Sequence, residues 1–507
     1  MKEEDKKSGP DPEKEPWAHP GDPEEEEQKE FLGYKNEQIE AAEGKILPTD
    51  VGNADRLVRD FGHLFKHNCI HDYFLIWNGK YWEKDDIGKV YSFAEHTGRN
   101  IYLEAGLIDD PKDRNNLGKW ANTSQNLYRL KAMVELTKYK SNIPVRPKDL
   151  DKDKYLFNVN NGTLDLQIGK KRKHNPDDLI TRIAPIDYDV SAECPNWLEF
   201  LNLTLSGNED NIKFLQKAVG YSMIGKTSER CFFILFGDGY NGKSTFIRTI
   251  STIFGDYAMS TPTSTLMSKY QEGIPNDLAR LDGPRFVSCD EGDEHQRLNA
   301  GLVKQMTGQD LVKARFMRGE WFEYYPEFKI WFATNHKPII RETTRAIWDR
   351  VREIPFTVQI PEKKRVADFF EKSLLPELSG ILAWCKEGFD LYQFEGLEPP
   401  DDVKNAVLQY RNEMDVIQGF LDDFCDVNTE EELGDRNELM KLSKYDLEQR
   451  KIYTINATDL HSRWAAETGG KISRSNFGRK LMEKGFVSKR FRDGIEWFGI
   501  KFIDIFE

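Results

Sequence analysis

The chain has 507 residues and a formal net charge of −14, and domains of roughly 100 to 200 residues would give it two to four of them. Half of that charge lies in residues 1–30, where twelve acidic residues stand against five lysines and five prolines interrupt any helix. We therefore expect a disordered acidic tail. No stretch approaches the roughly 20 apolar residues of a membrane span, and no apolar secretion signal begins the chain, which favours a cytoplasmic protein without a membrane partner.

The first folded region is expected to combine helices and strands. After a tail at residues 1–45, residues 46–200 are assigned to an amino-terminal α/β domain with a helix around residues 53–67. The aromatic runs on either side of Asn78-Gly79 predict a β-hairpin, because both turn residues tolerate a positive φ. A second strand pair is predicted over residues 155–169.

The middle of the chain predicts a parallel sheet. Strand-like runs at residues 231–236, 285–289 and 328–334 alternate with helical segments, as in α/β folds whose helices flank the sheet. We assign residues 201–360 to this core and residues 361–440 to a helical region. Residues 441–507 form a small module whose helices and short strands are compatible with a winged helix.

The phosphate-binding pattern Gly-x-x-x-x-Gly-Lys-[Ser/Thr] occurs twice, at residues 220–227 and 237–244. Such a loop needs a strand before it and a helix after it, so that N–H groups and the positive end of the helix converge on the phosphates. Only the second copy has both, so we interpret the first as a decoy. ATP and Mg²⁺ are expected at the second copy, with Lys243 on the β- and γ-phosphates and Ser244 on the metal. The expected nucleotide ligands are Gly237, Gly239, Asn241, Gly242, Lys243, Ser244 and Thr245.

Polar residues at the ends of neighbouring strands supply the remaining chemistry. Asp290 and Glu291 end an apolar strand; Glu291 is expected to activate water and Asp290 to support Mg²⁺. Asn335 follows the next strand, where an amide can hold the attacking water. Arg350 or Arg352 could be an arginine finger supplied to a neighbouring subunit, because a guanidinium suits the charge on the γ-phosphate. A surface ion pair with a neighbouring acid is the alternative.

Several motifs, in one order along the chain, resemble the superfamily 3 helicases of the phage and plasmid primase-helicase family, which includes poxvirus relatives. They are Gly52 to Leu57, Trp77 to Trp82, Asn161 to Leu166, Gly237 to Thr245, Ala279 to Leu281, Thr307 to Asp310, Ala314 to Arg318 and Thr334 to Pro338. The resemblance implies an AAA+-like core in a homo-hexamer, with ATP between subunits and single-stranded DNA moved 3′ to 5′ through the centre. It also implies Asn335 as a sensor, Arg350 as the finger, and a bacterial host cytoplasm as the location.

In this family a β-hairpin before the sensor strand projects into the channel and grips DNA. Residues 313–323 match it, with Gly319 in the turn and Lys313, Arg315 and Arg318 as candidate contacts to DNA phosphates. Many relatives carry a primase domain ahead of the helicase. The first 45 or so residues are too few and too acidic to form one, so we expect a primase on a separate protein.

A basic patch in the last module is hidden by the acidic total. Between residues 471 and 492, eight basic residues stand against the single acid Glu483. Arg474, Arg479 and Lys480, on a helix predicted at residues 473–484, are candidate contacts to the double-stranded DNA of an origin. Basic residues that merely solvate the module are the alternative. The module's aromatic residues are expected to pack in its core.

Together these features predict an ATP-dependent hexameric DNA helicase of a phage, plasmid or other mobile element, acting on single-stranded and forked DNA. One alternative is a DNA-binding replication initiator or remodelling ATPase without processive unwinding. Another is a nucleotide-regulated assembly protein that follows no DNA track. The basic hairpin speaks against the latter, because a nucleotide switch does not need one.

Overall fold

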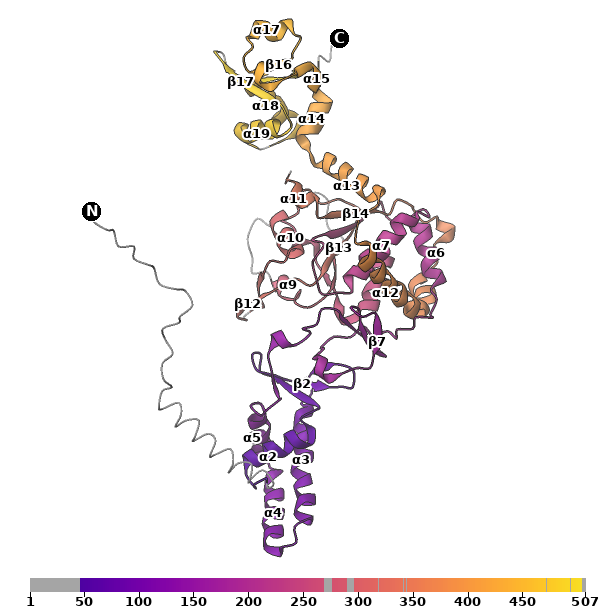
Figure 1. Ribbon diagram of the computed structural model, residues 1–507, viewed down its shortest axis with the longest axis vertical. Helices are drawn as coiled ribbons and strands as arrows, with labels where there is room; N and C mark the ends of the chain where they lie inside the picture. Colours follow the sequence, from indigo (N-terminus) through magenta and orange to yellow (C-terminus); the bar gives the residue numbers. More distant parts are fainter. Residues whose placement is uncertain are drawn as a thin grey trace, which may run out of the picture. The chain divides into compact units, whose positions relative to one another are not determined.

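The computed structural model describes residues 46–268, 276–289, 296–317, 319–340, 342, 344–470, 472–492 and 494–503 (Figure 1). The contacts divide the chain into two compact units. The first holds residues up to 150 except 79–81, and the second holds residues 79–81 together with residues 151 onwards. None of the described helices is both long and apolar enough to cross a bilayer.

The first unit combines helices with an antiparallel and parallel sheet of order β3-β2-β1-β4. Its strands are β1 (Phe65–Asn68), β2 (Tyr73–Trp77), β3 (Trp82–Lys84) and β4 (Pro144–Val145). Its helices are α2 (Asp50–Phe61), α3 (Lys89–Gly106), α4 (Pro111–Ser124) and α5 (Leu127–Thr137). Helix α2 begins where the Thr49 side chain accepts a hydrogen bond from the Gly52 N–H, a common N-cap.

One predicted element of this unit is confirmed and another is shorter than expected. The hairpin at Asn78-Gly79 joins β2 to β3, and Gly79 has the positive φ, +94°, that its turn requires. The helix expected over residues 53–67 ends at Phe61. Phe65 is instead the first residue of β1, fully buried and paired with Ile76 of β2. Sheet pairing therefore replaces the last turn of the expected helix.

A parallel five-stranded sheet lies at the centre of the second unit, in the order β14-β8-β13-β10-β9. Its strands are β8 (Phe232–Phe236), β9 (Ala258–Thr261), β10 (Phe286–Cys289), β13 (Lys329–Thr334) and β14 (Val351–Pro355). The three predicted strands are thus confirmed, together with their parallel pairing.

Both faces of this sheet are covered, as the near-continuous apolar sequence of β8 indicates. Phe233 and Leu235 join a buried cluster on one face and Phe232 and Ile234 a cluster on the other. The first cluster includes residues of α6 (Pro195–Thr204), α7 (Glu209–Ser222), α8 (Lys243–Phe254) and α12 (Leu378–Glu395). The second includes residues of α9 (Asn276–Ala279), α10 (Ala300–Thr307), α11 (Arg345–Trp348) and α13 (Asp401–Met414).

Residues 151–200 pack with this second unit. The predicted strand pair is present as β5 (Leu156–Val159) and β6 (Gly162–Asp165), and β7 (Lys170–Arg172) extends it. The Phe157 ring stacks on Tyr257, with centroids 4.6 Å apart, and meets Phe254 edge to face. These contacts place the division between compact units at residue 150, whereas the sequence placed it at residue 200.

Two further substructures complete the second unit. A hairpin of β11 (Val312–Arg315) and β12 (Trp321–Tyr324) precedes β13. The last module contains sheets β16-β18-β17 and β15-β19. Its strands are β15 (Cys425–Val427), β16 (Thr454–Asn456), β17 (Val487–Phe491), β18 (Gly494–Phe498) and β19 (Ile500–Phe502). Its helices are α14 (Val416–Phe424), α15 (Glu430–Leu433), α16 (Arg436–Leu439), α17 (Lys444–Gln449), α18 (Ala457–Thr468) and α19 (Arg474–Glu483).

Candidate functional site

The two copies of the phosphate-binding pattern lie at opposite kinds of helix end. The copy at residues 237–244 follows β8 and leads into α8, so it meets the positive end of that helix. The first three residues of the other copy, Gly220 to Ser222, form the end of α7, and its last five residues follow the negative end of that helix. There the carbonyl oxygens of Met223 and Ile224 accept hydrogen bonds from the buried side chains of Arg285 and Lys329. Basic side chains therefore occupy this helix end, which agrees with the interpretation as a decoy.

The second copy is shaped by two glycines that no larger residue could replace without a shift. A Cβ on Gly237 would lie 2.1 Å from the Phe356 carbonyl oxygen and 2.2 Å from Asn241 Nδ2. Gly242 has a φ of +85°, and a Cβ there would lie 2.7 Å from the Phe200 ring. The two glycines therefore let the loop pack closely against Phe356 and Phe200.

Lys243 is held at the mouth of the loop by three oxygen atoms. Its ammonium donates to the Gly237 carbonyl at 2.7 Å, to Asn241 Oδ1 at 2.8 Å and to Asn335 Oδ1 at 2.8 Å. The Asn241 amide in turn donates to the Phe356 carbonyl at 3.0 Å. These three acceptors of Lys243 are neutral oxygen atoms. A buried cation beside the N–H groups of a helix start fits an anionic phosphate.

The structure thus brings four of the predicted residues together: Gly237, Asn241, Lys243 and Asn335. Gly242 is the N-cap of α8, next to Lys243. Ser244 is exposed and Thr245 half-buried in the first turn of the helix. The Ser244 hydroxyl is therefore available to a metal bound with the nucleotide, whereas Gly239 lies in an open part of the loop, with φ +98° and no neighbour near its Cβ position.

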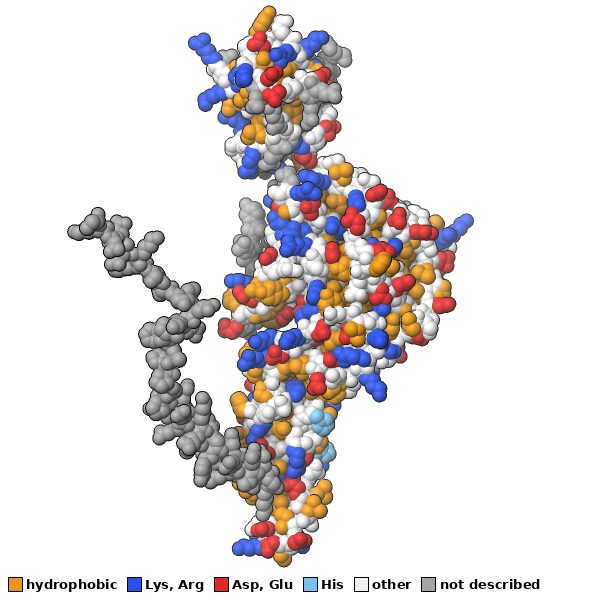
Figure 2. Space-filling model, in the orientation of Figure 1, with side chains coloured by type: hydrophobic (Ala, Val, Ile, Leu, Met, Phe, Trp, Pro, Cys, Tyr) orange, Lys and Arg blue, Asp and Glu red, His pale blue; other side chains and the backbone are white. Residues whose placement is uncertain are grey.

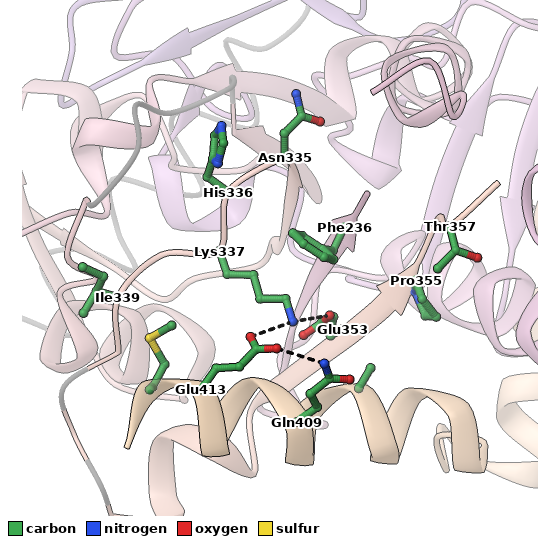
Figure 3. Close-up of a pocket in the computed structure, with 12 residues that line it drawn as sticks. Phe236, Asn335, His336, Lys337, Ile339, Glu353, Pro355, Thr357, Gln409 and Glu413 are labelled. Atoms are coloured by element: carbon green, nitrogen blue, oxygen red, sulfur yellow. Dashed lines mark hydrogen bonds and ion pairs between the residues drawn. The ribbon is translucent and has the colours of Figure 1, made fainter. Parts of the chain in front are cut away.

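A pocket of about 670 Å³ opens beside this loop, at the same edge of the sheet (Figure 3). Lys337 points toward two carboxylates there, with its Nζ 3.0 Å from Glu353 of β14 and 3.2 Å from Glu413 of α13. Burial raises the pKa of Glu353, and the neighbouring Lys337 opposes that rise. No sequence pattern predicts this cluster of Lys337, Glu353 and Glu413. Lys337 follows Asn335 closely, but nothing in the sequence pairs it with Glu413, 76 residues later.

Arg350 lies away from the phosphate loop of its own chain. Its carbonyl accepts a hydrogen bond from the Phe232 N–H at the start of β8, whereas the loop follows Phe236 at the other end. Four residues at roughly 3.3 Å each separate these ends by about 13 Å. The guanidinium donates to Thr307 Oγ1 at 3.2 Å and to the Ala346 carbonyl at 2.5 Å. In this position Arg350 does not serve its own loop.

Neither candidate finger forms the ion pair considered as its alternative. Asp349 pairs with Arg345, and Glu353 pairs with Lys337. Arg352 donates to the backbone carbonyl of Asp349 at 2.8 Å. Both arginines are therefore held mainly by uncharged oxygens.

Three predicted site residues, Asp290, Glu291 and Arg318, lie outside the residues that the structure describes. In the sequence the first two directly follow β10, whose last residue, Cys289, pairs with Phe332 of β13. Their roles in hydrolysis, metal binding and DNA binding stay predictions.

The remaining candidate DNA contacts lie on two surfaces. On the hairpin, Lys313 is exposed and its Nζ lies 3.3 Å from Glu323, directly opposite, while Arg315 lies over the Trp321 ring. The Gly319 N–H closes the turn by donating to the Phe316 carbonyl at 2.9 Å. Gly319 is thus in the turn, as predicted.

Helix α19 of the last module has one buried side and one basic side. Phe477 and Leu481 join the module's core, whereas Arg474 and Arg479 are exposed and Lys480 is half-buried. Arg474 donates to the hydroxyl of Thr458 at 2.8 Å. The prediction that the aromatic residues pack in the core is confirmed, since Trp464, Phe477 and Trp497 are buried and the half-buried Phe486 packs against the same cluster.

Comparison with known proteins places these features in a family context. Residues 54–206 match the family described as "D5 N terminal like", and residues 235–350 match a family of unknown function, DUF5906. "Putative helicase L207/L206" of Acanthamoeba polyphaga mimivirus is 27% identical over 298 residues, 55% of this chain and 31% of that protein. "Putative helicase 184R" of Invertebrate iridescent virus 6 is 28% identical, over 46% of this chain and 27% of that protein.

A third relative is named as a primase rather than a helicase. "Putative primase C962R" of African swine fever virus is 25% identical over 44% of this chain and 24% of that protein. Among solved structures, the apo C-terminal region of NrS-1 is similar over 66% of this chain and 87% of that chain, with 14% identity and a TM-score of 0.40. The matches to the curated proteins cover about a third or less of their length. They confirm the resemblance that the motifs predict, because the chain is similar to the D5 N-terminal family and to viral proteins named as helicases and primases.

Proposed function

We propose that the chain is the motor of a replication helicase of superfamily 3, with an AAA+-like core that hydrolyses ATP. The observation that carries the proposal is the contact between Lys243, at the start of α8, and Asn335, at the end of β13. It joins a phosphate-binding ammonium to an amide at the carboxyl edge of a parallel sheet, where such sites bind their ligands. Relatives named as helicases support the DNA side of the proposal.

The residues divide the work around the phosphates. The first-turn N–H groups of α8 bind the phosphate oxygens, and Lys243 exchanges its neutral oxygen partners for them. Asn335, released from Lys243, orients the attacking water, which Glu291 deprotonates. The hydroxyl of Ser244 and the carboxylate of Asp290 hold Mg²⁺, which neutralises charge on the phosphates when bound.

A second copy of the chain completes this site in the proposal. Arg350 lies at the sheet edge opposite to its own loop, so it can act as a finger only on a neighbour's nucleotide. Repetition of that contact gives a ring, for which we propose six subunits and 3′ to 5′ movement along single-stranded DNA. Arg352 is the alternative finger.

We propose that two basic surfaces of the chain bind DNA. Lys313, Arg315 and Arg318 of the hairpin contact the phosphates of a single strand. The exposed Arg474 and Arg479 of α19 suit double-stranded DNA, in a module that we propose to act as a winged helix. A primase partner and a bacterial host are further parts of the proposal.

The test compares two lysines of the same motif. Lys243→Ala should lower hydrolysis and strand separation on a forked substrate by about 100-fold or more, the usual effect of deleting one preorganised donor to transition-state charge. Lys226→Ala, the matching change in the decoy, should leave both rates within about twofold, because Lys226 is exposed and donates only to the Tyr155 hydroxyl. Equal losses would refute the assignment of the loop.

In the alternative function the chain also hydrolyses ATP but does not separate DNA strands. A wild-type protein that hydrolyses ATP and binds origin duplex without separating a fork would be a replication initiator or remodelling ATPase. The exposed arginines of α19 favour this second candidate over an ATPase without a DNA partner.

A further inference from the structure

The hairpin β11–β12 carries an exposed apolar patch on a surface with two cations. Its inner side is packed, since Val312, Ala314 and Tyr324 are buried and the Tyr324 hydroxyl donates to the Leu278 carbonyl at 2.7 Å. On the outer side and turn, Trp321 is 58% exposed, Phe316 48% and Met317 75%. In Figure 2 hydrophobic side chains gather over the edge of the unit where Figure 1 places β12. Large apolar side chains that are exposed close together in the structure are typical of a binding surface.

The Trp321 ring is fixed in place although it faces solvent. Arg315 lies directly opposite it across the hairpin, with its guanidinium 5.0 Å from the ring centroid. On the other face of the hairpin, Phe316 stacks on Phe322 with centroids 5.6 Å apart and planes within 19°. An aromatic ring that is already oriented loses little conformational entropy on binding.

Charge on the same face indicates what kind of ligand would lie there. Among the described residues Arg315 has no acidic partner, and its positive charge is shared only with the Trp321 ring. Lys313 pairs with Glu323 where both side chains are exposed, a contact that contributes little to stability. An aromatic face flanked by available cations is the combination with which proteins bind single strands, by stacking on bases and contacting phosphates.

We propose that Trp321 stacks on a base of single-stranded nucleic acid while Arg315 and Lys313 contact the adjoining phosphates. This inference deepens the proposed helicase function and rests on it. Because every base has a π-face, the contact tolerates any sequence, as a motor that moves along DNA requires. Loss of one such stack lowers affinity by roughly 5- to 100-fold.

The experiment uses two strands of equal length, oligothymidylate and the same sugar-phosphate chain without bases, with the full-length protein and fluorescence anisotropy. Wild type should bind oligothymidylate more tightly than the baseless strand. Trp321→Leu should remove most of that preference and leave the baseless strand unaffected, whereas Trp321→Phe should retain it. Tyr325→Leu is the matched control, since Tyr325 is 60% exposed but lies just beyond β12.

The binding results distinguish base stacking from a subunit interface and from failure of the proposed function. If Trp321→Leu weakens both strands equally, or neither, stacking is refuted. The substitution Trp321→Leu could instead change the molecular mass measured by light scattering. If the variant then binds both strands as wild type does when the two are compared in the same assembly state, the patch is a subunit interface and the proposal is overturned. Wild type that binds neither strand overturns the proposed function as well, whereas wild type that binds both strands equally refutes only the stack.

Discussion

Two glycines in one loop allow the conformation of the phosphate-binding loop to be tested by matched substitutions. Gly239 and Gly242 both have a positive φ, +98° and +85°. An alanine in that region costs about 1–2 kcal/mol of strain. At Gly239 nothing lies within 4 Å of the new methyl group, whereas at Gly242 it meets Phe200 at 2.7 Å and Thr204 at 2.8 Å. Overpacking adds about 1–3 kcal/mol, so Gly242→Ala should destabilise the protein by about 2–5 kcal/mol and Gly239→Ala by about 1–2 kcal/mol.

Urea unfolding of the two variants and of wild type, followed by tryptophan fluorescence, measures the difference. Gly242→Ala should shift the midpoint further at an unchanged slope. It should also weaken binding of a fluorescent ATP analogue more, because Gly242 directly precedes Lys243. Equal shifts for the two variants would show that contact with Phe200 does not constrain the loop. The conclusion that α6 packs closely against Gly242 would then be wrong.

Three further predictions address the rest of the site. Burial raises the Glu353 pKa above 4.5, so wild-type stability should fall relative to Glu353→Gln as pH rises from 4.5 through the folded-state pKa; parallel melting-temperature profiles would contradict this. Gly220→Ala should lower the melting temperature, because its Cβ would lie 2.1 Å from the Phe389 N atom, while ATP affinity of the folded protein stays unchanged. Mixing Arg350→Ala with Lys243→Ala subunits should restore some hydrolysis; no recovery at any ratio argues against a finger in trans.

The local part of the site could be predicted from sequence because a strand, a loop and a helix follow one another along the chain. Residues 231–244 carry the strand, both required glycines and Lys243 without interruption. The decoy could be rejected for the same reason, since its surroundings are also local. Asn335 followed from the rule that parallel strands end at one edge, which needs only the order of elements.

Other features depend on packing that local patterns do not encode. Lys337 meets Glu413 only because α13 packs beside β14, and no periodicity in the sequence fixes that contact. The opposite-edge position of Arg350 follows from the register of β14 on β8, which a sequence pattern leaves open. Residues 151–200 pack with the second unit through Phe157 and Tyr257, 100 residues apart, a contact that no local pattern predicts.

If Arg350 acts on the nucleotide of a neighbouring chain, the rate of ATP hydrolysis per chain should depend on protein concentration. The loop lies at the carboxyl ends of the parallel strands and Arg350 at their amino ends, so a contact between them would join two different surfaces of the chain. Repetition of such a contact either closes into a ring or continues as a filament. If Arg350 acts on the neighbour, activity per chain is not a constant. It should fall on dilution as the contact dissociates, and a nucleotide that bridges two chains should hold the assembly together at concentrations where the free chains separate.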